Sequence, residues 1–498
     1  ISMDLITVLL ASVVVLFLYF WFLRADGNYP PQPSRPLPVV GHLFSLEDDL
    51  RPQYKKWHKH LGEIFSLNMA GTIMVVINGY DLIKEILVKR ADEFSDRAPF
   101  FVDKATGMPC KGIVFANGKT WKEQRATVLS ILRNLGMGKD TLAQIIQNEV
   151  GHFMQLLAQL EGRPTKMRIN MNMGIANIIC SFLLGRRFEY DDPTFQKLMQ
   201  LLRYIVGNTS KGEIVSVFPI LSLLPGDHFH SKRLAASSKA VIEIIVEKFI
   251  REIQDDKSED VSQSNFVTLY LEEMGRKRKT GEETTMDEEN LAKSIFDFLV
   301  AGTETTSTSL LWCLLYALNY PEVQEKIFKE IENEIGLERA PTSQDKTKLV
   351  YLNAFLAEVS RLASVAAHAF THYCPQETTI KGYKIPKDSI LIPNLDSVMY
   401  DKKIWGNDVM SFKPERFINQ EGKLQIPEQL IPFGIGRRIC LGEGMAQTIR
   451  FLIMSSMFQR FQLLPRDAEA PPSLRYVFGA DVSPQSFEIR FVDRREEI

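Results

Sequence analysis

The 498-residue sequence is poor in cysteine and carries no excess of charge of either sign. Five cysteines, an odd number over this length, do not make a disulfide framework, so we expect them to be reduced, as in a protein that faces the cytosol. The 59 basic and 61 acidic residues exclude the basic surplus of a nucleic-acid-binding protein. Apolar residues make up 45% of the chain, an ordinary share that excludes a disordered protein and allows a core large enough to enclose a cofactor.

One long uncharged run extends from Leu5 to Leu23, with Asp4 before it and Arg24 after it. As a helix it would be about 28 Å long, close to the thickness of the hydrocarbon core of a bilayer. We therefore expect residues 1–25 to form an N-terminal anchor with a single membrane-spanning helix. A cleaved signal peptide would need a basic start and a cleavage site of small residues, and a buried core helix would carry a polar face. Basic residues follow the run, which predicts that the rest of the chain faces the cytosol.

Residues 26–40 are predicted to form a proline-rich hinge, because five prolines between positions 30 and 38 exclude a helix and favour a stiff, extended chain. No later linker divides the sequence, so residues 41–498 are predicted to form one large domain. Helical periodicity dominates it, residues 63–78 are typical of a β-hairpin with its turn at Ala70–Gly71, and the polar stretch 275–283 predicts a surface loop. The predicted fold class is mostly α with small, separate β-sheets.

The segment from Phe433 to Ala446, FGIGRRICLGEGMA, places Cys440 in a glycine-rich loop. A thiolate that binds heme iron must lie on a tight loop whose backbone approaches the porphyrin, and the glycines permit that approach. The amphipathic run after Gly442 predicts a helix whose N-terminus lies near the sulfur. The alternatives are a structural cysteine buried in a turn and a zinc site, but no second Cys or His stands nearby at ligand spacing.

With this loop the chain resembles the cytochrome P-450 family of heme-thiolate monooxygenases, over nearly its whole length and most closely the microsomal drug- and fatty-acid-metabolising branch. The resemblance implies the fold of that family, with residues 41–498 as its catalytic domain. It implies heme b (iron protoporphyrin IX) as the cofactor and Cys440 as the axial ligand of the iron. It also implies that Phe433 and Arg438 contact the heme, Arg438 through a propionate.

Two further segments match the family. Glu358 and Arg361 form its E-x-x-R pair on one helical face, and Arg416 lies in its P-E-R-F segment. The resemblance implies that these three side chains form a buried network that stabilises the fold around the cysteine loop. Such Glu/Arg pairs are also common on surfaces, so the pair alone would be weak support.

The segment 296–306, FDFLVAGTETT, resembles the long central helix of the family above the heme. Ala301 leaves space where dioxygen binds, and the Thr305 hydroxyl can return to a backbone carbonyl. Glu304 supplies an acid, and we expect it to order water with Thr305 for proton delivery to the iron-bound oxygen. The alternative is a polar patch on a surface helix, which the apolar flanks disfavour.

Trp121 and Arg125 match the W-x-x-x-R of the family, and the i, i+4 spacing puts both on one helical face. The resemblance implies that both donate to one heme propionate and that His372 contacts the other. The alternatives are a surface stacking pair and a plain structural histidine.

The substrate pocket is predicted from segments that line the cavity in relatives. Its lining is mostly apolar, which indicates a lipophilic substrate such as a fatty acid, a steroid or a xenobiotic. Ala367 stands where relatives have proline, so the stretch 363–372 puts the pocket shape in doubt. The predicted lining residues are Phe100, Phe101, Ile113, Phe115, Phe298, Val300, Val365, Ala366 and Ala369.

The resemblance implies a monooxygenase in the endoplasmic reticulum membrane that hydroxylates or epoxidises its substrate with one oxygen atom of O2. Electrons would come from an NADPH-dependent flavoprotein reductase, with cytochrome b5 as a second donor. Basic residues at docking positions of relatives are Lys122, Arg133, Lys139 and Arg437. The rival functions are a heme-thiolate isomerase or dehydratase, which generally lacks the acid–threonine pair, and a membrane-bound heme sensor, which would be expected to carry an output module.

Overall fold

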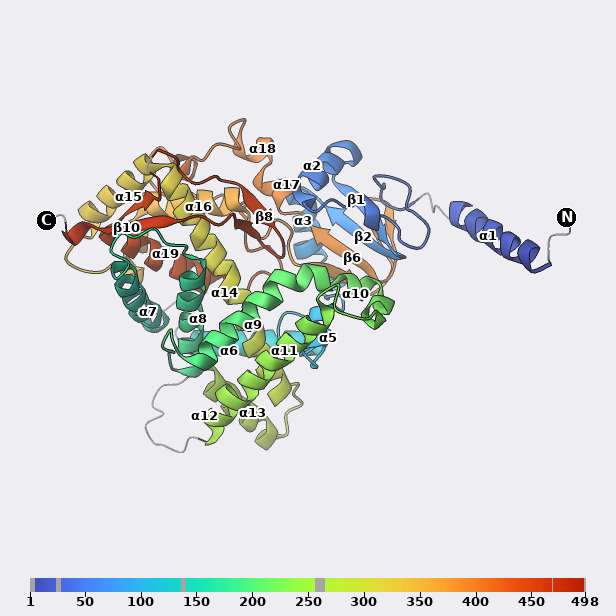
Figure 1. Cartoon of the computed structure of the whole chain (residues 1–498), viewed down its shortest axis with the longest axis horizontal. Coiled ribbons are helices and arrows are strands. Elements are labelled where there is room, and N and C mark those ends of the chain that lie inside the picture. The colour runs from blue at the N-terminus through green and yellow to red at the C-terminus, as the bar shows by residue number, and fades with distance from the viewer. Residues whose placement is uncertain (1–4, 24–27, 136–139, 256–264, 468, 497–498) are drawn as a thin grey trace.

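The computed structural model describes residues 5–23, 28–135, 140–255, 265–467 and 469–496, and most of them are helical (Figure 1). The α-helices are α1 (Leu5–Leu23), α2 (Leu50–Leu61), α3 (Tyr80–Lys84), α4 (Ala91–Phe94), α5 (Phe101–Ala105), α6 (Gly118–Asn134), α7 (Asp140–Ala158), α8 (Arg168–Leu184), α9 (Pro193–Gly212), α10 (Ile214–Val217), α11 (Ser231–Ile244), α12 (Glu252–Asp255), α13 (Phe266–Thr280), α14 (Glu288–Asn319), α15 (Pro321–Glu334), α16 (Val350–Ala363), α17 (Asp396–Met399), α18 (Lys402–Trp405) and α19 (Glu443–Arg460). The predicted mostly helical fold is confirmed.

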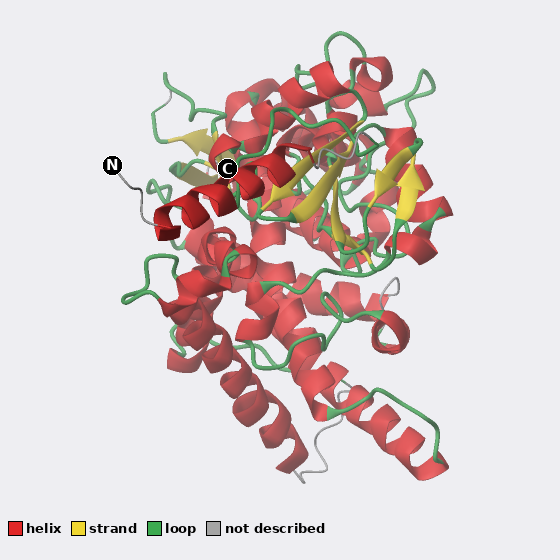
Figure 2. Ribbon diagram, turned by 90° about the vertical axis from the view of Figure 1, so that its right-hand side faces the viewer, coloured by secondary structure: helices red, strands yellow, loops and turns green. Residues whose placement is uncertain are grey.

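The strands form small, separate sheets, which lie among helices in the upper half of Figure 2. The largest sheet has four strands in the order β1–β2–β6–β3, and the other three sheets have two strands each, β10–β7, β4–β5 and β8–β9. The strands are β1 (Ile64–Met69), β2 (Thr72–Ile77), β3 (His372–Cys374), β4 (Thr378–Ile380), β5 (Tyr383–Ile385), β6 (Ser389–Pro393), β7 (Phe461–Pro465), β8 (Tyr476–Phe478), β9 (Val482–Pro484) and β10 (Ile489–Asp493).

The predicted hairpin is confirmed as the antiparallel pair β1–β2, with Met69 opposite Thr72. Ala70 and Gly71 form its turn with positive φ angles of 50° and 96°. Alternating apolar residues then bury one face of the sheet, where Val75 and Ile77 join the apolar cluster that also receives Leu391 of β6.

The 32-residue helix α14 runs through the helical body, with α8, α16, α19 and β9 packed against it. It starts where the Asp287 side chain accepts a hydrogen bond from Asn290 N–H, a typical N-cap. Apolar residues occur around most of its circumference, as expected for a helix buried on several sides. The exposed residues Ala301 and Thr305 in mid-helix are exceptions, and they mark the side of α14 on which the site lies.

The N-terminal helix α1 stands apart from the rest of the chain (Figure 1). Within the described residues, no helix combines the length and the apolar character needed to cross a membrane. The proline-rich segment that follows lies on the body, because Ser66 of β1 donates hydrogen bonds to the carbonyls of Pro30 and Pro31.

The polar stretch 275–283 was expected to be a surface loop, but α13 continues through it to Thr280. Arg276 bridges Glu273 and Glu282 on the exposed side of this helix. Gly281 then ends it in the left-handed conformation, with φ of 71°. The prediction of a loop was therefore wrong for residues 275–280.

Candidate functional site

The cysteine loop is a tight turn between Phe433 and α19. Cys440 N–H donates to Phe433 O (3.0 Å), and Ile439 N–H donates to Gly436 O (3.1 Å). Gly436 has φ of 83°, and a Cβ there would lie 2.1 Å from the carbonyl oxygen of Leu87. The loop thus depends on a residue without a side chain at this position.

The sulfur of Cys440 lies at the N-terminus of α19, as the sequence predicted. Burial raises the pKa of the Cys440 thiol, while the N–H groups of Gly442 and Glu443 and the positive charge of Arg125 act in the opposite sense. These groups and the helix dipole stabilise the thiolate and offset part of the effect of burial, but the pKa of the thiol stays above its ordinary value.

Three arginines converge beside this loop. Arg438 donates to Ser95 O (2.7 Å) and Ala116 O (2.7 Å), and Arg125 donates to Ile439 O (2.7 Å). Burial lowers the pKa of Arg97 well below its usual range, and the charges of Arg438 and Arg125 lower it further. Within the described part of the chain, none of the three arginines forms an ion pair with a carboxylate. Such a cationic group is suited to an anionic ligand.

Trp121 and His372 complete this group. The guanidinium of Arg438 lies 4.0 Å from the ring centroid of Trp121, and Trp121 Nε1 is buried without a hydrogen-bond partner among the described residues. His372 Nδ1 lies 2.6 Å from Phe94 O, which leaves Nε2 for another partner. Burial lowers the pKa of His372 well below its ordinary value, and the charge of Arg97 adds to this effect. The Trp121 N–H has no partner among the described residues, and the nearby arginines form no ion pair there. These groups would suit the two negatively charged propionates of a heme.

On α14, the exposed Ala301 and Thr305 lie one turn apart. The Thr305 hydroxyl donates to Ala301 O at 2.6 Å, the local bond that the sequence predicted. Within the described residues, no group of three or more His, Cys, Asp and Glu side chains is arranged to hold a metal ion.

Glu304 is engaged with α8. Its carboxylate accepts from Arg168 Nη1 (2.8 Å) and from Asn172 Nδ2 (2.6 Å). No local sequence pattern predicted that Arg168 and Asn172 would bind Glu304. The acid is therefore paired with a cation in this structure and points to the side of α14 that faces α8.

The structure brings Glu358, Arg361 and Arg416 together. Glu358 accepts from Arg361 Nε (2.7 Å) and Nη2 (2.9 Å) and from Arg416 Nε (2.9 Å). Glu358 and Arg361 are fully buried, and Arg361 also donates to Met399 O (3.0 Å). The network joins α16 to the segment that precedes the cysteine loop.

The predicted pocket residues lie in different surroundings. The rings of Phe100 and Phe115 lie 5.7 Å apart, near the loop that Arg438 binds. Phe298 packs instead against Phe182 and Phe266, at 5.3 and 5.4 Å, within the core between α8, α13 and α14. The remaining predicted residues are the partly buried Phe101, Val300, Val365 and Ala369, the buried Ile113 and the exposed Ala366.

Two residues of this region were missed by the sequence reasoning. The ring of Phe370 lies 5.5 Å from Phe100 and 5.4 Å from Phe115, so the three form one aromatic cluster. Arg97 donates to the carbonyls of Phe370 (2.7 Å) and Thr371 (2.6 Å) and lies under the Phe370 ring. No short motif marks either residue, because their partners are about 270 positions apart in the sequence.

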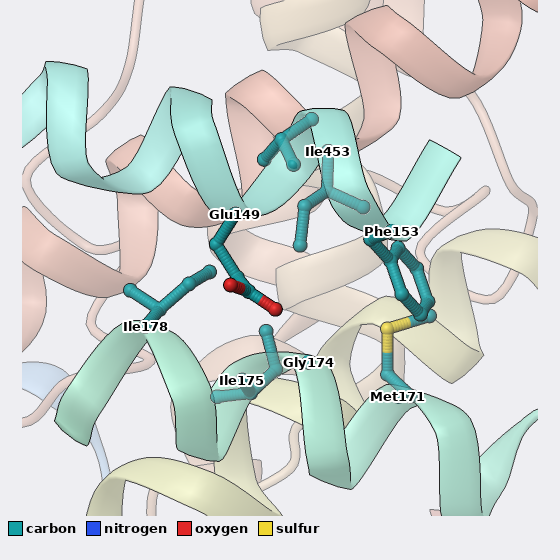
Figure 3. A pocket seen from close by; sticks show the side chains of 8 residues that line it. Glu149, Phe153, Met171, Gly174, Ile175, Ile178 and Ile453 are labelled. Atoms are coloured by element: carbon teal, nitrogen blue, oxygen red, sulfur yellow. The ribbon is translucent and has the colours of Figure 1, made fainter. Parts of the chain in front are cut away.

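A separate small cavity lies between α7, α8 and α19 (Figure 3). Its lining is apolar apart from Glu149, whose carboxylate accepts from Arg187 Nε (3.1 Å) and the Tyr190 hydroxyl (2.9 Å). None of the predicted site residues lines it, so it belongs to the packing of these helices.

The comparisons with known proteins agree with this geometry. The family model described as Cytochrome P450 matches residues 30–489. The chain is 34% identical to Cytochrome P450 2J5 of Mus musculus, covering 99% of this chain and 97% of that protein. It is 36% identical to Cytochrome P450 2C3 of Oryctolagus cuniculus (98% and 100%) and 34% identical to Cytochrome P450 2J2 of Homo sapiens (97% and 95%). The chain therefore belongs to the cytochrome P450 family and is a monooxygenase with heme b as its cofactor.

Proposed function

We propose that Cys440 is the axial thiolate ligand of the heme iron and that the substrate is oxidised between the heme and α14. The observation that carries this proposal is the position of the Cys440 sulfur at the N-terminus of α19. Beside it lie arginines that form no ion pair with a carboxylate of the described residues. Arg97, Arg125, Arg438, Trp121 and His372 would hold the propionates, and Phe433 would lie against the ring.

When bound, the heme supplies the chemistry that activates dioxygen and transfers one oxygen atom. The protein positions the reactants and controls protons. Thr305 keeps its hydroxyl on the exposed side of α14 through its bond to Ala301 O, and the carboxylate of the neighbouring Glu304 points toward α8, where it is paired with Arg168. The network of Glu358, Arg361 and Arg416 keeps the segment before the cysteine loop in place.

The proposed substrates are lipophilic compounds such as fatty acids, steroids or xenobiotics. The cluster of Phe100, Phe115 and Phe370 supports this, because neighbouring aromatic rings favour apolar or aromatic ligands. Hydroxylation and epoxidation are the proposed reactions.

We propose that the protein is anchored in the endoplasmic reticulum membrane by a single span within residues 1–25, with residues 26–40 as the hinge and residues 41–498 as the catalytic domain on the cytosolic side. The apolar side chains exposed along α1, such as Leu9, Leu10 and Val15, support a lipid environment for this helix.

An NADPH-dependent flavoprotein reductase is the proposed electron donor, with cytochrome b5 as a second one. Lys122 and Arg133 are exposed and accessible for docking, whereas Arg437 is paired with Asp92. Lys139, the fourth predicted docking residue, lies outside the described residues.

The test is the absorption spectrum of the dithionite-reduced, carbon-monoxide-treated protein, for the wild type and Cys440→Ala. A strongly red-shifted Soret band in the wild type alone is the expected result, because thiolate ligation of the iron causes this shift. A similar band in both proteins would show that Cys440 is not the ligand. Cys180→Ala, at a buried cysteine of α8, is the matched control and should keep the wild-type spectrum.

A further inference from the structure

A group of polar side chains lies between α8, α14 and β9, one turn from Thr305. Arg168 of α8 donates through Nη1 to Glu304 (2.8 Å) and through Nη2 to Pro484 O (3.3 Å). Arg168 therefore connects the carboxylate on α14 to strand β9. Asn172, also on α8, donates to the other oxygen of Glu304 (2.6 Å).

Asp481, directly before β9, adds a second carboxylate. Burial raises the pKa of Asp481, the Thr308 hydroxyl and the charge of Arg168 oppose the rise, and the charge of Glu304 adds to it. Thr308 follows Glu304 by four residues, so both lie on adjoining turns of the same side of α14. The Asp481 carboxyl thus keeps its proton to a higher pH than an ordinary aspartic acid, next to a carboxylate that is paired with arginine.

Several buried polar atoms in this region have no hydrogen-bond partner in the part of the chain that the structure describes. Buried polar atoms are normally bonded to protein or to ordered water, so such a group indicates bound water. A small cavity lined by Asn172, Thr303 and Glu304 adjoins the unpartnered atoms of Asn172 and Thr303, and the exposed Arg203 of α9 also lines it. The unpartnered atoms are Asn172 Oδ1, Thr303 Oγ1, Ser307 Oγ, Thr308 Oγ1 and Asp481 Oδ2.

We propose that Asp481 and Glu304, with water bound between Thr308 and Asn172, form a proton-transfer path along this side of α14 that ends beside Thr305. The inference rests on the proposed function, because the path would bring protons to the reaction proposed beside α14. A proton leaves the Asp481 carboxyl for the adjacent water, and the resulting carboxylate takes a proton from solvent. Only protons move along this path, and no electron is transferred.

The first test is infrared spectroscopy of the full-length, heme-loaded protein. We expect the wild-type spectrum minus that of Asp481→Asn to show the carbonyl band of a protonated carboxyl, shifted in D2O. Ser483 lies within β9, two positions from Asp481, so Ser483→Ala is the matched control and should keep the band. A difference spectrum without that band would overturn the proposal.

The second test is turnover with a reductase and a lipophilic substrate. Asp481→Asn should lower product formation about tenfold, less than the contribution of a general acid that acts directly, and raise the share of electrons lost to hydrogen peroxide. Asp481→Glu should restore both the turnover and the infrared band, which a merely structural role would not predict. Unchanged turnover and peroxide yield in Asp481→Asn would overturn the path.

The carbon-monoxide spectrum of each sample separates this inference from the proposed function. A red-shifted Soret band in every variant shows that the cysteine-ligated heme is intact, so a negative result then concerns the path alone. Thr308→Val serves as a second variant if Asp481→Asn does not retain heme. It removes a hydroxyl that is proposed to bind the water of the path, so product formation should fall as in Asp481→Asn, and unchanged turnover would contradict the proposal.

Discussion

At the scale of single residues, Gly436 determines how closely the cysteine loop approaches the chain around Leu87. Gly436→Ala would place a Cβ 2.1 Å from Leu87 O in a backbone conformation with φ of 83°. We expect the free energy of unfolding to fall by about 2–3 kcal/mol and bound heme to be lost, since the loop must move to relieve the clash. Denaturant unfolding and the heme content after purification measure the two effects.

Gly434 provides a matched control in the same loop. Its φ is 73°, but a Cβ there would meet no atom within 4 Å. Gly434→Ala should therefore cost only the left-handed backbone strain, about 1–2 kcal/mol. Equal losses in the two variants would show that steric contact with Leu87 is not what constrains the loop.

Residue contacts were predictable only where a short pattern carries them. The i, i+3 spacing of Glu358 and Arg361 predicts one helical face, and the structure shows the two side chains paired. Arg97 could not be identified in this way, because the carbonyls it binds belong to Phe370 and Thr371 in a distant segment. The pairing of Glu304 with Arg168 likewise depends on how α8 packs on α14, which no local pattern specifies.

At the scale of elements, the alternating apolar pattern of residues 63–78 predicted the β1–β2 hairpin, and the resemblance of residues 296–306 to the central helix of the family predicted α14. The same reasoning failed at the end of α13. Residues 275–280 are polar on all sides, which suits a loop, yet ion pairs of Arg276 with Glu273 and Glu282 accompany an exposed helical turn. Polarity alone does not separate an exposed helix end from a loop.

Glu123 joins α6 to α13 and to the segment before α14. It accepts hydrogen bonds from Lys277 Nζ (2.8 Å), Thr284 Oγ1 (2.6 Å) and Thr285 N–H (2.7 Å). Burial alone would raise the pKa of Glu123, but these bonds outweigh burial and lower the pKa from 4.5 to about 2. The stabilisation from Glu123 is therefore fully present above pH 4.5 and lost as the pH falls toward 2.

We expect Glu123→Gln to remove this part of the acid dependence. Denaturant unfolding measured between pH 5 and pH 3 should show a smaller loss of stability in Glu123→Gln than in the wild type. Glu283→Gln is the control, because Glu283 forms only an exposed ion pair with Lys119 and should leave the wild-type slope unchanged. Parallel slopes in all three proteins would contradict the role assigned to Glu123.

At the scale of the whole molecule, the segment that follows α1 is hydrogen-bonded to the body, whereas α1 itself lies away from it in Figure 1. Lys384 N–H donates to Asn28 O (2.8 Å), and Ser66 holds the carbonyls of Pro30 and Pro31. These bonds begin at residue 28, whereas α1 stands apart from the body (Figure 1). These bonds join the segment to two sheets, through Ser66 of β1 and Lys384 of β5, and neither bond involves α1.

Removal of residues 1–25 tests the proposed anchor. We expect the truncated chain to leave the membrane fraction after lysis without detergent, because the deletion removes the proposed anchor. Its reduced carbon-monoxide spectrum and thermal unfolding midpoint should match those of the full-length protein, because every bond described above lies beyond the deletion. Sedimentation of both chains with the same membranes is the measurement. Retention of the truncated chain in the pellet would show instead that the body itself binds the bilayer, and a lost spectrum would show that the N-terminal segment supports the heme site.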